Sequence, residues 1–205
     1  MEYKTVKEFA VDEYVVKRSR FLGYAMPVTT QKEAEDFIAS IKSKHWDAAH
    51  NVYAYILRGS NSKRYSDDGE PQGTAGMPAL EVLRNIGVTD TAVVITRYFG
   101  GILLGGGGLV RAYSHSAKIA VEKAKIITMA QCLDLQISCD YNFYGKLNAF
   151  LSSEDVKILS SDFGAEVTVT FRIKQENFDP LCKKLTDLSN GKSKPEIICE
   201  NFCEF

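Results

Sequence analysis

The chain has 205 residues, of which 45% are hydrophobic and 25% are charged, with a formal net charge of −1, as is ordinary for a soluble globular protein of one or two domains. No apolar run approaches the roughly 20 residues that span a bilayer, and the charged N-terminal segment lacks the apolar core of a signal peptide. We therefore expect a cytoplasmic protein with no membrane partner.

The charge is unevenly distributed along the chain. Residues 1–131 carry 17 Lys and Arg against 14 Asp and Glu, a difference of +3, and residues 132–205 carry 8 against 12, a difference of −4. Because nucleic-acid binding requires local positive charge, the N-terminal part is the better place for a polyanion. The five cysteines lie in the C-terminal third without zinc-site spacing, so we expect buried, reduced structural thiols, no metal and no cofactor.

The first residues predict a hairpin and a helix. β-Branched and aromatic residues surround the polar segment Lys17–Arg20 within residues 9–28, which favours two paired strands. Thr30 and Glu33 have the spacing of a capping box. Apolar residues at helical spacing then continue to about Lys44.

The next elements alternate between strands and helices. Residues 52–57 contain no charge and predict a strand buried on both faces. After an acidic loop, Thr74 is positioned to cap a helix that ends before Gly87. The apolar run 91–99 predicts a central strand, and 107–124 predicts a helix whose small core residues permit close packing on a sheet.

The segment from residue 131 onward has the pattern of a second domain. Its predicted strands are residues 133–139, 156–159, 165–173 and 196–205, and a helix pattern follows the first and the third. The βαββαβ order is that of a ferredoxin-like domain, in which both helices cover one face of an antiparallel sheet. We therefore expect an α+β protein with domains at residues 1–130 and 131–205.

The other face of this second sheet is expected to be open. It would present to solvent or to a partner the side chains of Asp134, Gln136, Ser138, Glu166, Thr168, Thr170 and Arg172. An RNA-recognition sheet of this topology needs stacking aromatic residues on that face, and these two strands have none. We therefore expect a protein partner on it rather than RNA.

Two segments of the first domain are dense in glycine. Residues 67–76 read DDGEPQGTAG, and residues 97–111 read RYFGGILLGGGGLVR. Such density is typical of backbone that takes positive φ or approaches another group closely. The second segment lies between a strand and a helix, where unpaired amides favour an anion, and Arg97 and Arg111 would add charge. The alternative is that the glycines only permit tight turns and close packing.

Neither segment matches a known catalytic template. The glycines lack the Gly-Lys-Ser/Thr of a P-loop and the dinucleotide spacing. Asp67, Asp68 and Glu70 could hold Mg²⁺, but loop acids beside Gly and Pro are usually turn formers. His50 and His115 have no accompanying nucleophile motif. We therefore assign no catalytic and no metal-binding residue, and leave open whether the protein is an enzyme.

The segments Ser66–Pro78, Arg97–Gly101, Leu104–Gly105 and Gly107–Tyr113 closely resemble the signature of the YigZ/IMPACT family, and the resemblance covers the whole chain. It implies an N-terminal βα sandwich like domain two of ribosomal protein S-five, as in domain four of elongation factor G. It also implies a ferredoxin-like C-terminal domain similar to domain five of that factor. Eukaryotic relatives regulate translation, partly through an additional RWD domain that this sequence does not contain.

The resemblance also places the family's signature residues on one surface of the first domain. They fall here on His50, Asp67, Asp68, Glu70, Gln72, Arg97, Gly100, Gly101, Gly107, Gly108 and Arg111. With Gly105 and Gly106 they are our candidate ligand-binding or RNA-binding residues.

We expect a noncatalytic binding or regulatory protein that contacts RNA, the ribosome or a translation factor through this surface. One alternative is a nucleotide- or phosphate-binding small-molecule enzyme that uses the glycine loop with Asp67, Asp68 and Glu70. The other is a protein-interaction scaffold that acts through the open sheet face of the second domain.

Overall fold

A computed structural model describes residues 2–60 and 62–204 of the chain. The chain divides into two compact units, one from Tyr3 to Thr128 and one that comprises Glu2 and the residues from Met129 onward. Each unit contains helices packed on an antiparallel sheet, so the two-domain α+β architecture expected from the sequence is confirmed. Within the described residues, no helix is long and apolar enough to cross a membrane.

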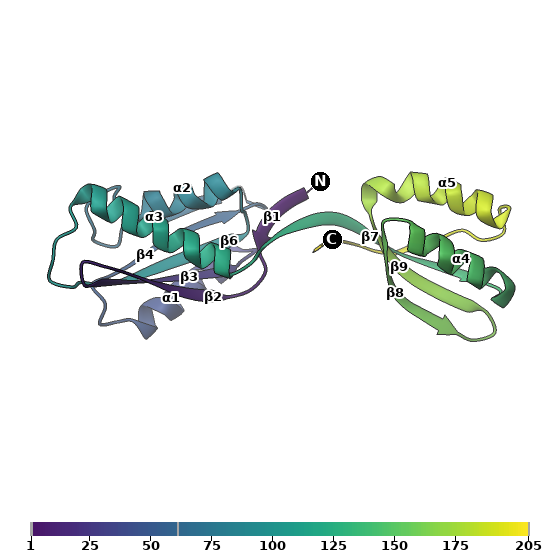
Figure 1. Cartoon of the computed structure of the whole chain (residues 1–205), viewed down its shortest axis with the longest axis horizontal. Helices are drawn as coiled ribbons and strands as arrows, with labels where there is room; N and C mark the ends of the chain where they lie inside the picture. Colours follow the sequence, from purple (N-terminus) through teal and green to yellow (C-terminus); the bar gives the residue numbers. More distant parts are fainter. Residues whose placement is uncertain (1, 61, 205) are drawn as a thin grey trace. The chain divides into compact units, whose positions relative to one another are not determined.

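The first unit is a five-stranded antiparallel sheet with helices on both faces (Figure 1). In spatial order its strands are β2 (Ala10–Val16), β3 (Ser19–Pro27), β6 (Thr91–Tyr98), β4 (His50–Leu57) and β5 (Ser62–Ser66). α2 (Gly76–Ile86) and α3 (Gly106–Lys123) pack on one face, and α1 (Gln31–Lys44) packs on the other. The central strand β6 therefore has a helical layer on each side.

Successive side chains of β6 belong in turn to the two hydrophobic cores on either face of the sheet. Val93 and Ile95 belong to the core under α2 and α3, whereas Ala92 and Val94 belong to the core under α1. All four side chains are fully buried. A strand covered on both faces reads as a continuous apolar run, and the prediction of a central strand here is confirmed.

The predicted helix starts hold for α1 but not for α2. The side chain of Thr30 accepts a hydrogen bond from the Glu33 amide at 3.2 Å, as the capping-box spacing predicted. The predicted Thr74 cap is wrong, because the Thr74 hydroxyl donates instead to the Pro71 carbonyl at 2.6 Å and α2 begins at Gly76. The sequence also did not predict β5, whose short polar segment becomes an edge strand by pairing with β4.

The second unit has the predicted βαββαβ order. Its elements are β7 (Ile126–Cys139), α4 (Tyr141–Ser153), β8 (Val156–Phe163), β9 (Val167–Lys174), a 3-10 turn (Gln175–Asn177), α5 (Phe178–Ser189) and β10 (Glu196–Glu204). The strands lie in the order β10-β7-β9-β8, and each pairing is antiparallel. This is the ferredoxin-like arrangement, with α4 and α5 on one face of the sheet (Figure 1). β1 (Glu2–Val6) also pairs with β7.

Two details of this unit differ from the expectation. Asp134, expected on a solvated face, is buried and accepts two hydrogen bonds from Arg172, from Nε at 2.6 Å and from Nη2 at 2.9 Å. A buried carboxylate needs such a partner, and the alternation of the strand could not show that one lies opposite. All five cysteines are free thiols, but only Cys132 and Cys139 are buried, whereas Cys182 and Cys203 are half-buried and Cys199 is exposed. Phe205, the last residue of the predicted final strand, lies outside the described residues.

Candidate functional site

Asp67 caps helix α2 from the preceding loop. Its Oδ1 accepts hydrogen bonds from the amides of Ala75 at 3.1 Å and Gly76 at 2.8 Å, and its Oδ2 accepts one from Gly73 at 2.9 Å. The first amides of a helix have no partner within the helix, and a carboxylate beside them also complements the helix dipole. Asp67 thus supplies the cap that the sequence assigned to Thr74.

Asp68 ties the same loop to two other elements. Its Oδ1 pairs with Lys42 Nζ at 2.6 Å on α1, and its Oδ2 accepts from the Asn51 amide at 2.6 Å on β4. Its carbonyl accepts from His50 Nδ1 at 2.8 Å, so this nitrogen carries the proton. With its amide, which donates to Ser66 Oγ at 3.1 Å, all four hydrogen-bonding groups of Asp68 are used to hold the loop.

Glu70 lies in a buried polar cluster. Its Oε1 accepts hydrogen bonds from Arg97 Nη1 at 2.5 Å and from the Tyr113 hydroxyl at 2.8 Å, and His50 Nε2 lies 3.8 Å away. Glu70, Arg97 and Tyr113 are each at least nine-tenths buried. Burial, followed by the negative charge of Glu70, raises the pKa of Tyr113 above its ordinary value, so the hydroxyl remains a donor.

The acidic residues of the signature therefore stabilise the fold. A buried carboxylate that lost its partners would be costly, and Arg97 and Tyr113 prevent this at Glu70. The guanidinium of Arg97 faces the interior, where its Nε lacks a hydrogen-bond partner among the described residues. Within the same residues, no group of three His, Cys, Asp or Glu is arranged to hold a metal ion. Five of the signature residues therefore have side chains that are held by contacts within the domain: His50, Asp67, Asp68, Glu70 and Arg97.

The remaining candidates lie at the surface. Gln72 is exposed on the loop before α2. Gly101, Gly105, Gly106 and Gly107 are exposed, whereas Gly100 and Gly108 are half-buried. α3 begins at Gly106 without a side-chain cap, and Gly105 before it has a φ of 71°. Within the described residues, the first amides of α3 thus have no side-chain partner such as Asp67 provides at the start of α2.

Gly100 brings the glycine loop against the hairpin turn between β2 and β3. A Cβ atom at this position would overlap the backbone of Arg18 and Ser19, and the Gly100 amide donates to Ser19 Oγ at 3.2 Å. Only glycine permits this approach. The contact places Gly100 beside the cationic turn Lys17–Arg18.

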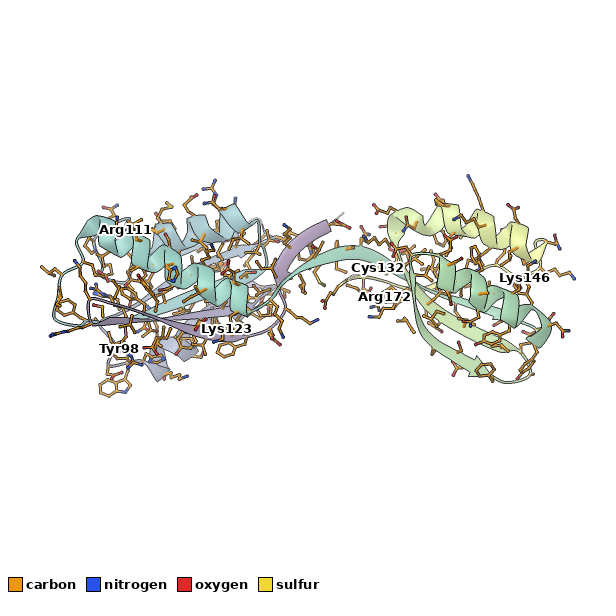
Figure 2. The ribbon with its side chains drawn as sticks, in the orientation of Figure 1. Tyr98, Arg111, Lys123, Cys132, Lys146 and Arg172 are labelled. Atoms are coloured by element: carbon orange, nitrogen blue, oxygen red, sulfur yellow. The ribbon has the colours of Figure 1, made fainter. Side chains whose placement is uncertain are left out.

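Three cations and two apolar side chains are exposed on the hairpin turn, the glycine loop and the start of α3. Phe99 is 50% exposed and Leu103 is 81% exposed. Lys17, Arg18 and Arg111 are exposed and form no ion pair within the described part of the chain. Arg111 Nη1 lies 4.0 Å from the position of a Cβ on Gly107, and Figure 2 shows Arg111 near the start of α3. We call Lys17, Arg18, Phe99, Leu103 and Arg111 the tip surface.

The backbone of the hairpin turn is strained at both cations. Lys17 has a φ of 44° and Arg18 a φ of 64°, in the left-handed region where Gly, Asn and Asp are favoured. Residues with a Cβ cost about 1–2 kcal/mol each in this region. The turn thus carries two cations where Gly, Asn or Asp would be less strained.

Reasoning from the sequence missed several of these residues. Tyr113 was not singled out, although a tyrosine within a helix of small residues is a signal for a buried hydroxyl with a partner. Phe99 and Leu103 lie in a segment in which the glycines are the main signal, so these two residues are not predicted as site residues. Lys17 and Arg18 were assigned to a polar turn without a role.

Comparison with known proteins agrees with this organisation. The model of the Impact N-terminal domain matches residues 17–121, and a domain of unknown function (DUF1949) matches residues 137–192. The IMPACT family member YvyE of Bacillus subtilis (strain 168) is 38% identical over 193 residues, which cover 93% of this chain and 88% of that protein. The IMPACT family member YigZ of Escherichia coli (strain K12) is 33% identical over 179 residues, which cover 86% of this chain and 88% of that protein.

A solved structure described as the crystal structure of an hypothetical protein is also similar. It shares 30% sequence identity and has a TM-score of 0.61, with 98% of each chain covered. The likeness spans both domains rather than one of them. The chain therefore belongs to the IMPACT family.

Proposed function

We propose that this chain is a noncatalytic RNA-binding protein that acts on the translation machinery and contacts RNA through the tip surface. The observation that carries the proposal is the combination of three exposed cations without ion-pair partners in the described chain and two exposed apolar side chains around one loop. Phosphates attract the cations, and bases can lie on the apolar side chains. The cytoplasmic location expected from the sequence is part of this proposal.

The inward orientation of the acidic residues supports it. Asp67, Asp68 and Glu70 are neutralised by backbone amides, by Lys42 and by Arg97. They therefore add little repulsion to a polyanion that approaches the glycine loop. The amides at the start of α3, which have no side-chain cap, would add donors for phosphate oxygens.

The strain at the hairpin turn is a second support. The two-residue hairpin requires positive φ at both positions, so the strain comes from the choice of Lys and Arg there, and strain of this kind often coincides with a functional site. Lys17 and Arg18 keep two positive charges at the tip at a cost in stability. The family resemblance to translation-factor domains gives the context in which an RNA contact would act.

Co-sedimentation with ribosomes and binding to purified ribosomal RNA over a series of salt concentrations test the proposal. The triple variant Lys17→Ala/Arg18→Ala/Arg111→Ala should bind more weakly, and its salt dependence should fall by about 0.7 in slope for each lost phosphate contact. The matched control is Lys32→Ala/Lys63→Ala/Arg84→Ala, which removes three exposed cations elsewhere in the same domain.

Equal affinity and equal salt slope in the two triple variants would contradict the assignment of the tip surface. Binding to ribosomal RNA without any co-sedimentation with ribosomes would contradict the role in translation. Failure of the wild-type protein to bind either RNA or ribosomes would overturn the proposed function as a whole.

A further inference from the structure

Trp46 is the single tryptophan of the chain and is 83% exposed. It lies in the segment between α1 and β4. An indole ring buries a large apolar area when it is covered, so such exposure marks a contact site more often than an exposed small side chain does. The surroundings of Trp46 show which contact is suitable.

The neighbours of Trp46 hold it beside the end of β6. The Tyr98 hydroxyl donates to Asp47 Oδ1 at 3.1 Å, so its oxygen accepts from His45 Nδ1 at 2.9 Å. His45 Nε2 then accepts from the Tyr24 hydroxyl at 2.6 Å. His45 and Asp47, which flank Trp46, thus both form hydrogen bonds with Tyr98. These bonds fix the backbone at Trp46, while its indole ring stays exposed to solvent. Figure 2 shows Tyr98 on the side of the sheet that α1 covers.

Phe99 provides a second exposed ring, one residue after Tyr98. The guanidinium carbon of Arg97 lies 5.5 Å from the Phe99 ring centre, and Arg97 belongs to the buried cluster under α3. The end of β6 therefore has Trp46 near its α1 face and Phe99 near its α3 face. The cationic turn Lys17–Arg18 meets Gly100, the residue after Phe99. Arg20 pairs with Tyr98 across the sheet, with its guanidinium carbon 6.0 Å from the Tyr98 ring centre, and it also forms an ion pair with Glu13.

This arrangement distinguishes between forms of nucleic acid. A duplex keeps its bases stacked inside and presents mainly phosphates and sugars, so exposed rings gain little from it. A single strand offers unpaired base faces at intervals along a charged backbone, and aromatic side chains stack on these faces regardless of sequence. Two exposed rings at the end of β6, with exposed cations on the adjoining turn, match the second pattern.

We infer that the ligand of the tip surface is single-stranded RNA, whose bases stack on Trp46 and Phe99 while its phosphates contact Lys17, Arg18 and Arg111. This inference rests on the proposed function and names the form of RNA that the same site takes. It also extends the site to Trp46, which lies outside the glycine-rich signature. The contact requires no base-specific hydrogen bond, so uridine-rich RNA without secondary structure is a suitable probe.

The tryptophan fluorescence of the full chain reports the contact directly, because Trp46 is the only source of it. Titration with single-stranded oligouridylate should quench this fluorescence, and duplex RNA of the same length at the same salt concentration should bind at least about tenfold more weakly. Affinities of the variants are measured by anisotropy of labelled RNA. Trp46→Ala and Phe99→Ala should each weaken binding about tenfold, and Trp46→Phe should retain most of the affinity.

The control variant is Tyr65→Ala, which removes another exposed ring of the same domain and should bind as the wild type does. Equal affinity for duplex and single strand, or unchanged affinity in both Trp46→Ala and Phe99→Ala, would overturn the inference and leave the proposed function standing. Equal competition by an acidic peptide of the same charge would overturn it also, since such a peptide has no base faces. Absence of binding to any RNA would overturn the proposed function instead.

Discussion

Gly100 lies so close to the backbone of Arg18 that no side chain fits between them. The contact joins the glycine loop to the hairpin turn, which are far apart in the sequence. The contact gives Gly100 a structural role, whereas Lys17 and Arg18 beside it remain available to bind a ligand. The two roles can be separated by mutation.

Gly100→Ala should destabilise the first domain by about 2 kcal/mol or more, because its methyl group would overlap backbone atoms that cannot move independently. Urea unfolding followed by circular dichroism measures the change. Gly59→Ala is the control, since no atom lies within 4 Å of a Cβ there. Equal stability of the two variants would show that the turn and the loop move apart at little cost.

Arg18→Gly should stabilise the fold by about 1 kcal/mol and weaken RNA binding at the same time. The substitution relieves the left-handed backbone conformation and removes one cation of the tip surface. Lys125→Gly is a matched control, because Lys125 also has a positive φ, 61°, and an exposed side chain. That variant should leave RNA affinity unchanged. A loss of RNA affinity as large in Lys125→Gly would attribute the effect to net charge alone.

Tyr113→Phe should destabilise the protein by about 1–3 kcal/mol, since the buried Glu70 carboxylate loses a donor while the aromatic ring remains. Exposed Tyr65→Phe serves as the control. In Glu70→Gln the hydroxyl faces a neutral group, so adding Tyr113→Phe to that variant should cost less than it does in the wild type. Additive losses would mean that the two residues do not interact.

His45 should make the first domain less stable in mild acid. Burial first, and then the charge of Lys44, lower the pKa of His45 from its ordinary 6.5, although Asp47 opposes this. Below that ordinary value the unfolded chain takes up a proton that the folded chain does not, so stability falls as the pH drops towards the folded pKa. The free energy of unfolding should therefore be lower at about pH 5.5 than at about pH 7.5.

His45→Gln should reduce this pH dependence. His50 and His115 remain in both proteins, so the difference between them isolates His45. Identical pH profiles for wild type and variant in urea unfolding would contradict the prediction.

The sequence was sufficient for features that depend on local pattern. The apolar run of β6 indicated a strand covered on both faces, and alternation in β7 and β9 indicated the ferredoxin-like sheet. Gly87 ends α2 with a φ of 81°, as its position predicted. In each case the physical cause acts over a few neighbouring residues.

The candidate site could not be worked out in the same way, because its contacts join distant residues. Glu70 meets Arg97 across 27 positions and Tyr113 across 43, and only the fold brings the three together. Asp67 reaches the start of α2 because its loop folds back, which spacing alone does not show. Exposure of Trp46 likewise depends on the packing of its neighbours.

The Arg172–Asp134 ion pair determines the charge at the centre of the open sheet face of the second domain. The two charges cancel at its centre, where Gln136, Thr170 and the hydrogen-bonded Ser138 and Thr168 are uncharged. A partner that bound at this centre would be held by short-range contacts, and changes in ionic strength would affect it little. Salt should therefore release ligands of the tip surface while leaving such a partner bound, and a salt wash would separate the two kinds of binding.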